Sequence, residues 1–599
     1  MKISPFLFLF FLSFISFSQN QTRTKYQISF ENAKHHEAHI QIEFDQITDS
    51  IFELRMSRTS PGRYAIHEFA KNVYDVFAFN ENGDTLKIVR PNPHQWNILN
   101  PSKKILVHYK LFADRADGTF SQINEGHAHL NIPATFMFAP KRMSEPLKVD
   151  IVPRVDLKWQ IATQLKPIAE NLFFAPNVQY FMDSPIELSN FTKRSFEIDS
   201  NGKDYTINFI LHHNGTEIET DTYFEQVKKI VAQEMLVFGE LPNFDFNEYY
   251  FLACYLPYVS GDGMEHRNST ILTDIESLSE GGMKNNIGTV AHEFFHSWNV
   301  ERIRPRSLEP FDFTDANMSG ELWFAEGFTT YYTNLILCRA GIITDKQYVE
   351  GLARTFNYVW NSPGTDFFNP IEMSYQASFV DAATFLDPTS RHNTFISYYS
   401  YGSVLGLALD LSLRETFKEK NLDGFMALTY QKYGKKEIPY TITDLEETLC
   451  EYTNEDFGKS FFKHFIYDSK MPDYKTLFRS VGVNLSQDNS EKIFLGADLE
   501  WKNGKLILSS YPVKNSPFYN AGLTNGDILI SINRKDVFKD FFDKYQFKPQ
   551  DKLNIVFKRY GVRKETEIIT ASDPSYTTKL SDSSNEKILK NRKDWLGAK

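Results

Sequence analysis

The chain contains one run of residues whose types and spacing favour metal-assisted hydrolysis, His292-Glu293-Phe294-Phe295-His296. In a helix, side chains four residues apart project from the same face one turn apart, so His292 and His296 can bind one metal ion. Glu293 follows the first histidine directly and can reach a metal-bound water without binding the metal itself. The pattern H-E-x-x-H therefore predicts a hydrolytic zinc site in which Glu293 is the catalytic base.

The residues around the two histidines support this prediction. Residues 286–300 are predicted to form a helix that is apolar nearly all round, and such helices are buried. Buried histidines and a buried glutamate need polar partners, which a metal ion supplies. The alternative is a pair of surface histidines on an amphipathic helix.

A carboxylate further along the chain completes the expected ligand set. Glu326 lies in the run LWFAEGFTTYY at residues 322–332, the start of a second predicted helix that continues to about residue 338. An unpaired charge among aromatic and small residues is costly, and zinc removes that cost. Two histidines and one glutamate leave the fourth zinc position open for water, as catalysis requires. We therefore expect His292, His296 and Glu326 to hold one zinc ion.

Four stretches, in this order, resemble the glycyl aminopeptidase family of gluzincin metallopeptidases, whose members carry a C-terminal PDZ domain. They are residues 263–266, 292–305, 322–332 and 398–402. The long interval between His296 and Glu326 favours this branch over the aminopeptidase N branch. The resemblance implies a thermolysin-like, gluzincin catalytic domain that hydrolyses peptides from the N-terminus, with a preference for small residues such as glycine and alanine.

The resemblance also implies a second catalytic residue, Tyr399. The family places a tyrosine in a Tyr-x-Lys-Gly run before a helix, and the corresponding run here is Tyr399-Ser400-Tyr401-Gly402. The tyrosine hydroxyl would donate a hydrogen bond to the oxyanion of the tetrahedral intermediate. Tyr401 stands where the family has lysine, and Tyr398 is the alternative donor.

A substrate-binding role is implied for Gly263, Met264 and Glu265. These residues follow a strand-like run at residues 249–258, and the resemblance places them along the substrate with Glu265 on the free α-amino group. A carboxylate there would favour a cationic amine and enforce cleavage from the N-terminus. In the alternative, Glu265 is a turn residue and the enzyme is an endopeptidase.

The elements that must position these residues indicate a multidomain α+β protein. Short alternating runs with Gly and Pro between them predict an N-terminal β-sandwich at residues 22–195. Residues 196–480 are predicted as the gluzincin catalytic domain with a helical part, including an amphipathic helix at 402–417. A chain of 599 residues is long enough for about three or four domains.

The last part of the chain resembles a PDZ domain at residues 483–572. Phe494-Leu495-Gly496-Ala497 resembles that family's carboxylate-binding loop, and residues 516–533 match its core pattern. Such domains bind an extended C-terminal peptide by adding a strand to a sheet edge, which would be a partner of this chain. Packing against the catalytic domain is the alternative role. Residues 573–599 are predicted to be a polar tail of weak order.

The N-terminus predicts export. Lys2 precedes a short apolar run at residues 6–17 and small residues, which is typical of a signal peptide, here residues 1–18. We therefore expect a periplasmic or secreted protein. The run is too short to span a bilayer comfortably, and no membrane span is expected in the mature chain. Three cysteines, an odd number, argue against a fold built on disulfides.

The composition excludes one class of partner, because a net charge of −11 argues against nucleic acid. Peptides are the expected substrates, and the expected function is that of an exported zinc aminopeptidase. Two alternatives are an endopeptidase of the same fold and an inactive peptide-binding module that acts through its sandwich and PDZ domains. The complete set of His292, Glu293, His296 and Glu326 favours an enzyme.

Overall fold

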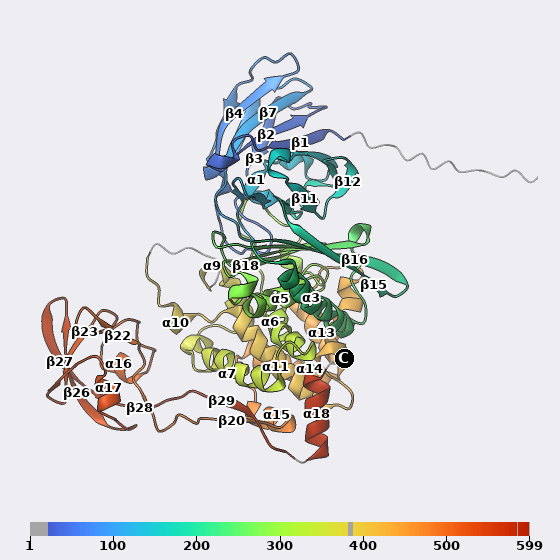
Figure 1. Ribbon diagram of the computed structural model, residues 1–599. Helices are drawn as coiled ribbons and strands as arrows, with labels where there is room; N and C mark the ends of the chain where they lie inside the picture. Colours follow the sequence, from blue (N-terminus) through green and yellow to red (C-terminus); the bar gives the residue numbers. More distant parts are fainter. Residues whose placement is uncertain (1–21, 381–386, 584, 598–599) are drawn as a thin grey trace, which may run out of the picture.

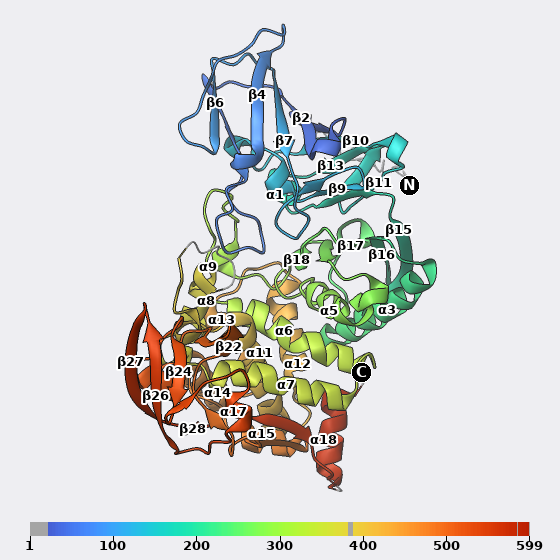
Figure 2. The ribbon, with the colours of Figure 1, turned by 60° about the vertical axis from the view of Figure 1, so that its left-hand side comes forward.

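The computed structural model describes residues 22–380, 387–583 and 585–597. A β-rich N-terminal region, a central region with many helices and a C-terminal β region follow one another along the chain (Figures 1 and 2). The predicted multidomain α+β organisation is confirmed at this level. The predicted signal peptide, residues 1–18, lies outside the described residues.

The N-terminal region is built on a seven-stranded sheet with the order β12-β13-β10-β1-β2-β7-β4. Buried and more exposed residues alternate along β2 and β7, so one face of the sheet packs on a core that contains Ile40, Ile42 and Val107. The strands are β1 (Thr24–Ser29), β2 (Glu37–Phe44), β4 (Val73–Asn80), β7 (Ile105–Phe112), β10 (Leu147–Val152), β12 (Lys166–Ala169) and β13 (Leu172–Ala175).

Two smaller sheets complete this region. One has the order β3-β6-β5, from Ile51–Arg55, Gln95–Leu99 and Ile88–Val89. The other has the order β11-β14-β9-β8, from Gln160–Thr163, Ile186–Ser189, His127–Leu130 and Gln122–Ile123. Every residue of β9 and β14 is buried, although both strands carry polar side chains.

A five-stranded sheet begins the central region, with the order β15-β16-β17-β19-β18. Its strands are β15 (Thr192–Ser200), β16 (Lys203–His213), β17 (Glu248–Tyr255), β18 (Asp262–His266) and β19 (Ser269–Asp274). β16, β17 and β19 are parallel, and β18 is antiparallel to β19 at the sheet edge. The predicted substrate-binding residues Gly263, Met264 and Glu265 therefore lie on an edge strand.

Helices cover this sheet and form most of the central core. They include α3 (Glu217–Phe238), α5 (Ile287–Phe295), α6 (Leu322–Arg339), α7 (Asp345–Trp360), α11 (Tyr398–Thr416), α12 (Leu422–Thr429) and α13 (Ile442–Tyr452). The helix that begins near residue 286 was predicted to continue to residue 300, but α5 ends at Phe295 and His296 occupies its C-cap. The chain turns there, and the Asn299 side chain donates to the carbonyls of Phe324 and Ala325.

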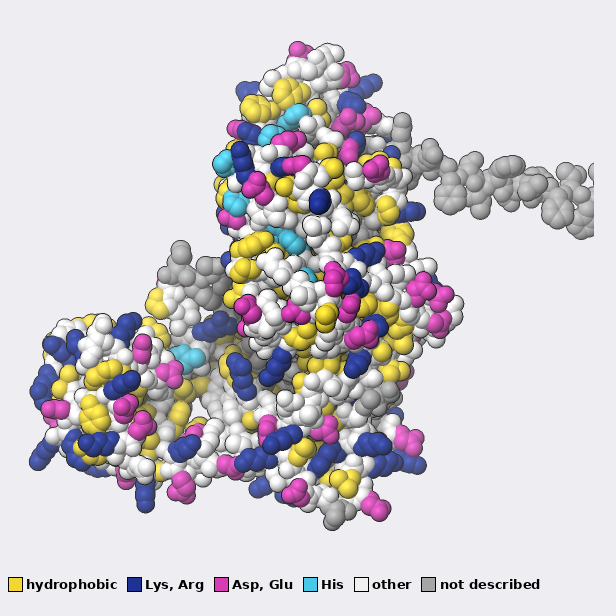
Figure 3. Space-filling model, in the orientation of Figure 1, with side chains coloured by type: hydrophobic (Ala, Val, Ile, Leu, Met, Phe, Trp, Pro, Cys, Tyr) yellow, Lys and Arg dark blue, Asp and Glu magenta, His cyan; other side chains and the backbone are white. Residues whose placement is uncertain are grey.

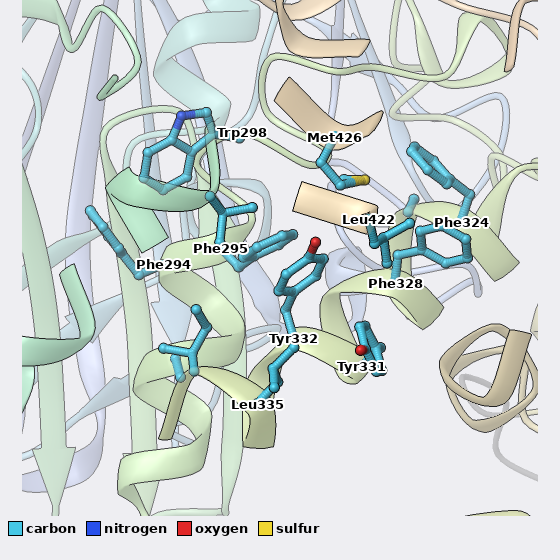
Figure 4. Close-up of a cluster of buried hydrophobic side chains, with 14 of the residues drawn as sticks. Phe294, Phe295, Trp298, Phe324, Phe328, Tyr331, Tyr332, Leu335, Leu422 and Met426 are labelled. Atoms are coloured by element: carbon cyan, nitrogen blue, oxygen red, sulfur yellow. The ribbon is translucent and has the colours of Figure 1, made fainter. Parts of the chain in front are cut away.

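Aromatic packing fixes α5 against α6 (Figure 4). Phe295 stacks on Tyr332 with ring centroids 4.6 Å apart, and Phe294 and Trp298 meet edge to face at 5.4 Å. These rings are buried, as expected for a helix that is apolar nearly all round. The relative position of the two helices that carry His292, His296 and Glu326 is therefore set by a rigid core.

Two glycines allow α11 to lie unusually close to α6. A Cβ atom on Gly402 would overlap the carbonyl oxygen of Trp323, and one on Gly327 would overlap the backbone of Gly402. Only glycine at both positions permits this approach. The N-terminus of α11, with Tyr398 and Tyr399, is thereby brought beside Glu326 on α6.

The C-terminal β region contains a sheet with the order β22-β23-β24-β26-β27, which lies beside the helices in Figure 1. Its strands are Leu499–Lys502, Lys505–Leu508, Ile528–Ile532, Lys552–Arg559 and Val562–Ile569. A separate core with Leu508, Phe518 and Phe541 lies beneath it. Hydrogen bonds between Asn393 and the backbone of Pro512 and Lys514 join this region to the helical one.

The prediction that residues 573–599 form a polar tail of weak order is wrong for the part that the structure describes. β29 (Thr577–Leu580) pairs with β20 (Val483–Ser486), and α18 (Glu586–Leu596) packs on the helical region. The indole of Trp595 is buried and donates to the hydroxyl of Tyr331. A few apolar residues anchor a segment whose average composition is polar.

Among the described residues, none of the helices has the length and apolar character needed to cross a membrane. On the face shown in Figure 3, acidic and basic side chains are interspersed rather than gathered into a field of one sign. The three cysteines are free thiols.

Candidate metal centre

His292 and His296 on α5 and Glu326 on α6 converge on one point. The Nε2 atoms of the two histidines lie 3.1 Å apart, and the Glu326 Oε2 atom lies 3.2 Å from that of His296 and 3.7 Å from that of His292. All three ligand atoms fall within 4.8 Å of one another. The two helices thus bring together the three side chains that were predicted to bind zinc.

Hydrogen bonds on the far side of each imidazole orient the Nε2 atoms. Thr333 donates its hydroxyl to the Thr329 carbonyl, so its oxygen accepts from Nδ1 of His292, 3.2 Å away. Nδ1 of His296 donates to the Asn299 carbonyl. With Nδ1 protonated, each neutral ring presents an Nε2 lone pair to the same point. Two lone pairs and a carboxylate oxygen that face one another fit a divalent cation.

The electrostatics of the three side chains favour a bound cation. Burial acts to lower the pKa of His296, but the carboxylates of Glu326 and Glu265 outweigh it and raise that pKa to about 10. Burial acts to raise the pKa of Glu326, yet the two histidines hold it well below the usual range. The negative charge that attracts a proton to His296 also attracts a metal ion, and the metal would displace that proton.

Glu326 is fixed by a residue that the sequence did not single out. The Tyr64 hydroxyl donates to Oε1 of Glu326 at 2.7 Å, which leaves Oε2 facing the histidines. Tyr64 is buried and comes from a loop of the N-terminal region, 262 residues from its partner. Nothing marks it among the 30 tyrosines of the chain, so only the fold could reveal this contact.

Glu293 is buried beside the three predicted ligands, and its Oε2 atom has no hydrogen-bond partner among the described residues. Burial raises the pKa of Glu293 well above its usual value, and the nearby Glu265 and Glu326 act in the same direction. A Cβ atom at Gly263 on β18 would overlap Oε1 of Glu293. Glycine at this position leaves the carboxylate room beside the edge strand.

Glu265 faces the same cluster from β18. Its carboxylate lies within 4.8 Å of ligand atoms of Glu293 and His296. Burial raises the pKa of Glu265, with His296 opposing the shift and Glu326 adding to it. Gly62 lies behind it with φ +75°, and a Cβ atom there would overlap Met264 and approach both Glu265 oxygens. A buried carboxylate in this position suits an ammonium group.

The loop that carries Gly62 and Tyr64 also fixes the edge strand. Arg63 pairs with Asp262 on β18, whose Oδ2 atom also accepts from the backbone N–H of Gly118, 3.0 Å away. Two loops of the N-terminal region therefore hold β18 beside α5. No motif in the sequence indicates this role for Arg63, Asp262 or Gly118.

Tyr399 lies on the His292 side of the cluster, with its ring centroid 6.0 Å from that of the imidazole. Burial and Glu326 raise the pKa of the Tyr399 hydroxyl, which keeps it a hydrogen-bond donor. Tyr398 is fully buried and packs edge to face on Tyr64 at 6.0 Å. Tyr399 is half-buried, so of the two tyrosines it is the one with an accessible face.

A cavity of about 1090 Å³ lies between the N-terminal and central regions. It is lined by residues that include Pro61, Tyr180, Arg267 and Arg302. None of the predicted catalytic, substrate-binding or metal-binding residues lines it, although Pro61 adjoins Gly62. The size of this cavity therefore does not identify it as the active site.

Two family models match the chain. The model of the peptidase M61 N-terminal domain matches residues 25–190, and that of M61 glycyl aminopeptidase matches residues 285–405. The second match contains His292, Glu293, His296, Glu326 and Tyr399. Residues 263–265 lie outside both matches, as does the C-terminal β region. None of the curated protein sequences gives a match.

The fold is similar to that of an aminopeptidase N family protein from Idiomarina loihiensis, with a TM-score of 0.82 and 22% identity over 96% of this chain and 100% of that chain. More distant is aminopeptidase A of Legionella pneumophila in complex with aspartic acid (TM-score 0.45, 13% identity, 92% of this chain and 57% of that one). A two-domain M1 zinc metallopeptidase bound to L-arginine gives a TM-score of 0.43 at 13% identity, over 73% and 92% of the two chains.

Proposed function

Because the chain belongs to the M61 glycyl aminopeptidase family of metallopeptidases, we propose that it is an exported zinc aminopeptidase that removes small N-terminal residues, glycine and alanine, from peptides. The observation that carries this proposal is the position of Glu265. Its carboxylate lies within 4.8 Å of Glu293 and His296, where it can hold a free α-amino group beside the scissile bond.

One zinc ion fits the candidate metal centre. The donor set of two imidazole nitrogens and a carboxylate is that of hydrolytic zinc sites, which keep one position open. When bound there, zinc supplies a Lewis acid that makes water a nucleophile near neutral pH and polarises the substrate carbonyl. Thr333, Asn299 and Tyr64 orient the three ligands from outside.

Glu293 takes the proton from the attacking water and passes it to the leaving amine. Burial raises its affinity for that proton, which suits a base that must hold the proton until the amine accepts it. Tyr399 donates its hydroxyl to the oxyanion of the tetrahedral intermediate. Both residues border the same small volume as the histidines, so no large movement of the chain is needed.

The edge strand β18 supports exopeptidase action. A substrate backbone can pair with a free strand edge, which would align the first peptide bond with Glu293. Glu265 would then meet the α-amino group, and an N-blocked peptide would place an uncharged group against a buried carboxylate. These points favour an aminopeptidase over an endopeptidase of the same fold.

Two further parts of the proposal rest on the sequence patterns. The signal-like residues 1–18 support export to the periplasm or the medium. The PDZ-like pattern of residues 483–572 and the sheet formed by β22 to β27 support binding of a C-terminal peptide by strand addition.

Hydrolysis by the purified mature protein tests the proposal. Glycyl and alanyl p-nitroanilides should be cleaved, a leucyl substrate more slowly, and N-acetylated counterparts at least tenfold more slowly again. Chelation should abolish activity and zinc should restore it. Equal cleavage of free and N-acetylated substrates would identify an endopeptidase, and a zinc-loaded protein inactive on all of them would contradict the enzymatic role.

A further inference from the structure

A second group of metal-binding side chains lies away from the candidate metal centre. His127 on β9, His212 on β16 and Cys254 on β17 bring their ligand atoms within 4.8 Å of one another. β9 belongs to the N-terminal region, whereas β16 and β17 belong to the five-stranded sheet of the central region. The group therefore bridges two regions of the chain, and none of its members serves in the proposed reaction.

The strand registers explain why these side chains meet. His212 and Cys254 are direct neighbours in the parallel pair of β16 and β17. On the other side, Glu187 of β14 pairs directly with His129 of β9. His127 lies on the same face of β9 as His129, two residues away. One imidazole from β9 and one carboxylate from β14 thus face an imidazole and a thiol across the seam between the two sheets.

The distances approach those of a tetrahedral zinc site. The Cys254 Sγ atom lies 3.8 Å from Nδ1 of His127 and 3.7 Å from Nδ1 of His212. The Glu187 Oε1 atom lies 3.5 Å from each of the same two nitrogens. Usual zinc bond lengths give tetrahedron edges of about 3.6 Å from sulfur to nitrogen and about 3.3 Å from nitrogen to oxygen. Each of these four distances lies within a few tenths of an ångström of the corresponding edge.

The tautomer of His127 places a nitrogen lone pair in the cluster. Gln122 donates its amide NH₂ to Asp114, so its Oε1 atom faces Nε2 of His127 at 2.9 Å and must accept a proton from it. In the neutral ring, Nδ1 is then a lone pair. That lone pair lies 3.5 Å from the Glu187 carboxylate and 3.8 Å from the Cys254 sulfur, so it can accept from the Cys254 thiol or bind a cation that displaces the thiol proton.

The two carboxylate oxygens of Glu187 differ in their hydrogen bonds. Its Oε2 atom lies 3.1 Å from Nδ1 of His129, whose other nitrogen donates to the Asp117 carbonyl. Its Oε1 atom is buried and has no hydrogen-bond partner among the described residues. The Nδ1 atoms of His127 and His212 lie 3.5 Å from Oε1, and a buried carboxylate gains from a closer positive charge.

We propose that His127, His212, Cys254 and Glu187 bind a second zinc ion with a structural role, which joins the N-terminal region to the central sheet. Nitrogen, sulfur and carboxylate donors suit zinc, and four protein ligands leave no position for substrate or water. The site is closed, because His127, Glu187 and Cys254 are buried and His212 is nearly so. The ion stabilises the interface that also positions Tyr64 on Glu326.

Metal analysis of the full mature chain by inductively coupled plasma mass spectrometry tests this proposal. Wild-type protein purified in zinc-containing buffer should hold two equivalents of zinc per chain. Cys254→Ala should hold one. Cys338→Ala, which removes another buried thiol, should still hold two. His292→Ala should lose the zinc of the candidate metal centre and keep the zinc bound by Cys254. The zinc content of each site is thus measured independently of the other site and without an activity assay.

Cobalt substitution can detect a thiolate ligand directly in the wild-type protein. Cobalt-loaded wild-type protein should show a near-ultraviolet thiolate-to-cobalt charge-transfer band, since Cys254 is the only thiol in the group. Cys254→Ser should lose the band and Cys338→Ser should keep it. If Cys254 variants fail to fold, His212→Gln replaces them, with loss of one zinc equivalent expected. A single equivalent in the wild type together with no thiolate band would overturn the proposal.

Discussion

The two histidine clusters are built in opposite ways. The candidate metal centre takes three ligands from two helices, which leaves one position of a zinc ion open, and lies beside Glu293, whose Oε2 atom has no hydrogen-bond partner among the described residues. The cluster around Cys254 takes its side chains from four strands in two sheets and offers four donors. Open zinc sites are catalytic and closed ones are structural. We therefore expect catalysis at the candidate metal centre and a structural role for the cluster around Cys254.

Both clusters lie where the N-terminal and central regions meet. Tyr64 crosses that interface to reach Glu326, and His127 crosses it to reach His212 and Cys254. The N-terminal region consequently contributes a side chain that orients Glu326 in the candidate metal centre. Substitutions in one cluster should leave the metal content of the other unchanged.

The largest effect is expected for Glu293→Gln. Loss of the general base should lower kcat on alanyl p-nitroanilide by about 10²- to 10⁴-fold, while the zinc content stays unchanged because Glu293 is not a ligand. Steady-state kinetics and metal analysis measure both. Glu280→Gln, on an exposed glutamate, is the control and should behave as wild type. Loss of zinc from Glu293→Gln would make Glu293 a ligand and remove the distinction drawn above.

Glu265→Ala should lower kcat/KM for free-amine substrates by about 10- to 100-fold, because a charge-assisted hydrogen bond contributes about 1.5–3 kcal/mol. Most of the effect should fall on KM. N-acetylated substrates, which lack the ammonium group, should be affected far less. Parallel kinetics on the two substrate classes provide the check, and equal losses on both would remove Glu265 from its role.

Tyr64→Phe should weaken zinc binding at the candidate metal centre by about tenfold. Loss of a residue that orients a metal ligand typically lowers the metal affinity by about 10- to 100-fold, and we expect the lower value. Competition with a chelator measures the affinity, and zinc held by the Cys254 cluster should exchange as in wild type. Tyr258→Phe, on a tyrosine beside His127, is a matched control for the centre. An unchanged affinity in Tyr64→Phe would show that the hydrogen bond does not hold Glu326 in place.

The smallest effect concerns pH and Glu234 on α3, a fully buried carboxyl with no hydrogen-bond partner among the described residues. Burial raises its pKa well above the usual value. Since the folded pKa exceeds the unfolded one, its contribution to stability is present below the unfolded pKa and is lost as pH rises through the folded pKa.

Glu234→Gln cannot ionise and should escape that loss. Its Tm relative to wild type should therefore rise from pH 5 to pH 9, by a few degrees in thermal melts of the zinc-loaded protein. Glu225→Gln, on the exposed side of the same helix, should show no such trend. A Tm difference that stays constant with pH would mean that Glu234 finds a partner when it ionises.

The sequence predicted the relative positions of residues that lie within about one helical turn of each other. The geometry of His292, Glu293 and His296 follows from helix periodicity alone, and Glu326 was identified by its charge in an apolar helix. Glu265 and Tyr399 were indicated only through the family resemblance, and their roles remain predictions. The edge strand that carries Glu265 could be taken for a turn, because its pairing partner was not evident.

Contacts between distant segments could not be predicted. Tyr64 reaches Glu326 across 262 residues, and His127, Glu187, His212 and Cys254 show no motif spacing. Their proximity follows from strand registers in two sheets, which local sequence does not specify. Residues 585–597 were misjudged for a related reason, since average polarity concealed the helix face that buries Trp595.

The most direct measurement is a crystal structure with anomalous difference maps recorded above and below the zinc absorption edge. We expect a zinc peak between Nε2 of His292, Nε2 of His296 and Oε2 of Glu326, with the fourth position open toward Glu293. A zinc-loaded crystal with no peak at that point, or with the peak bound by Glu293 in place of Glu326, would contradict it.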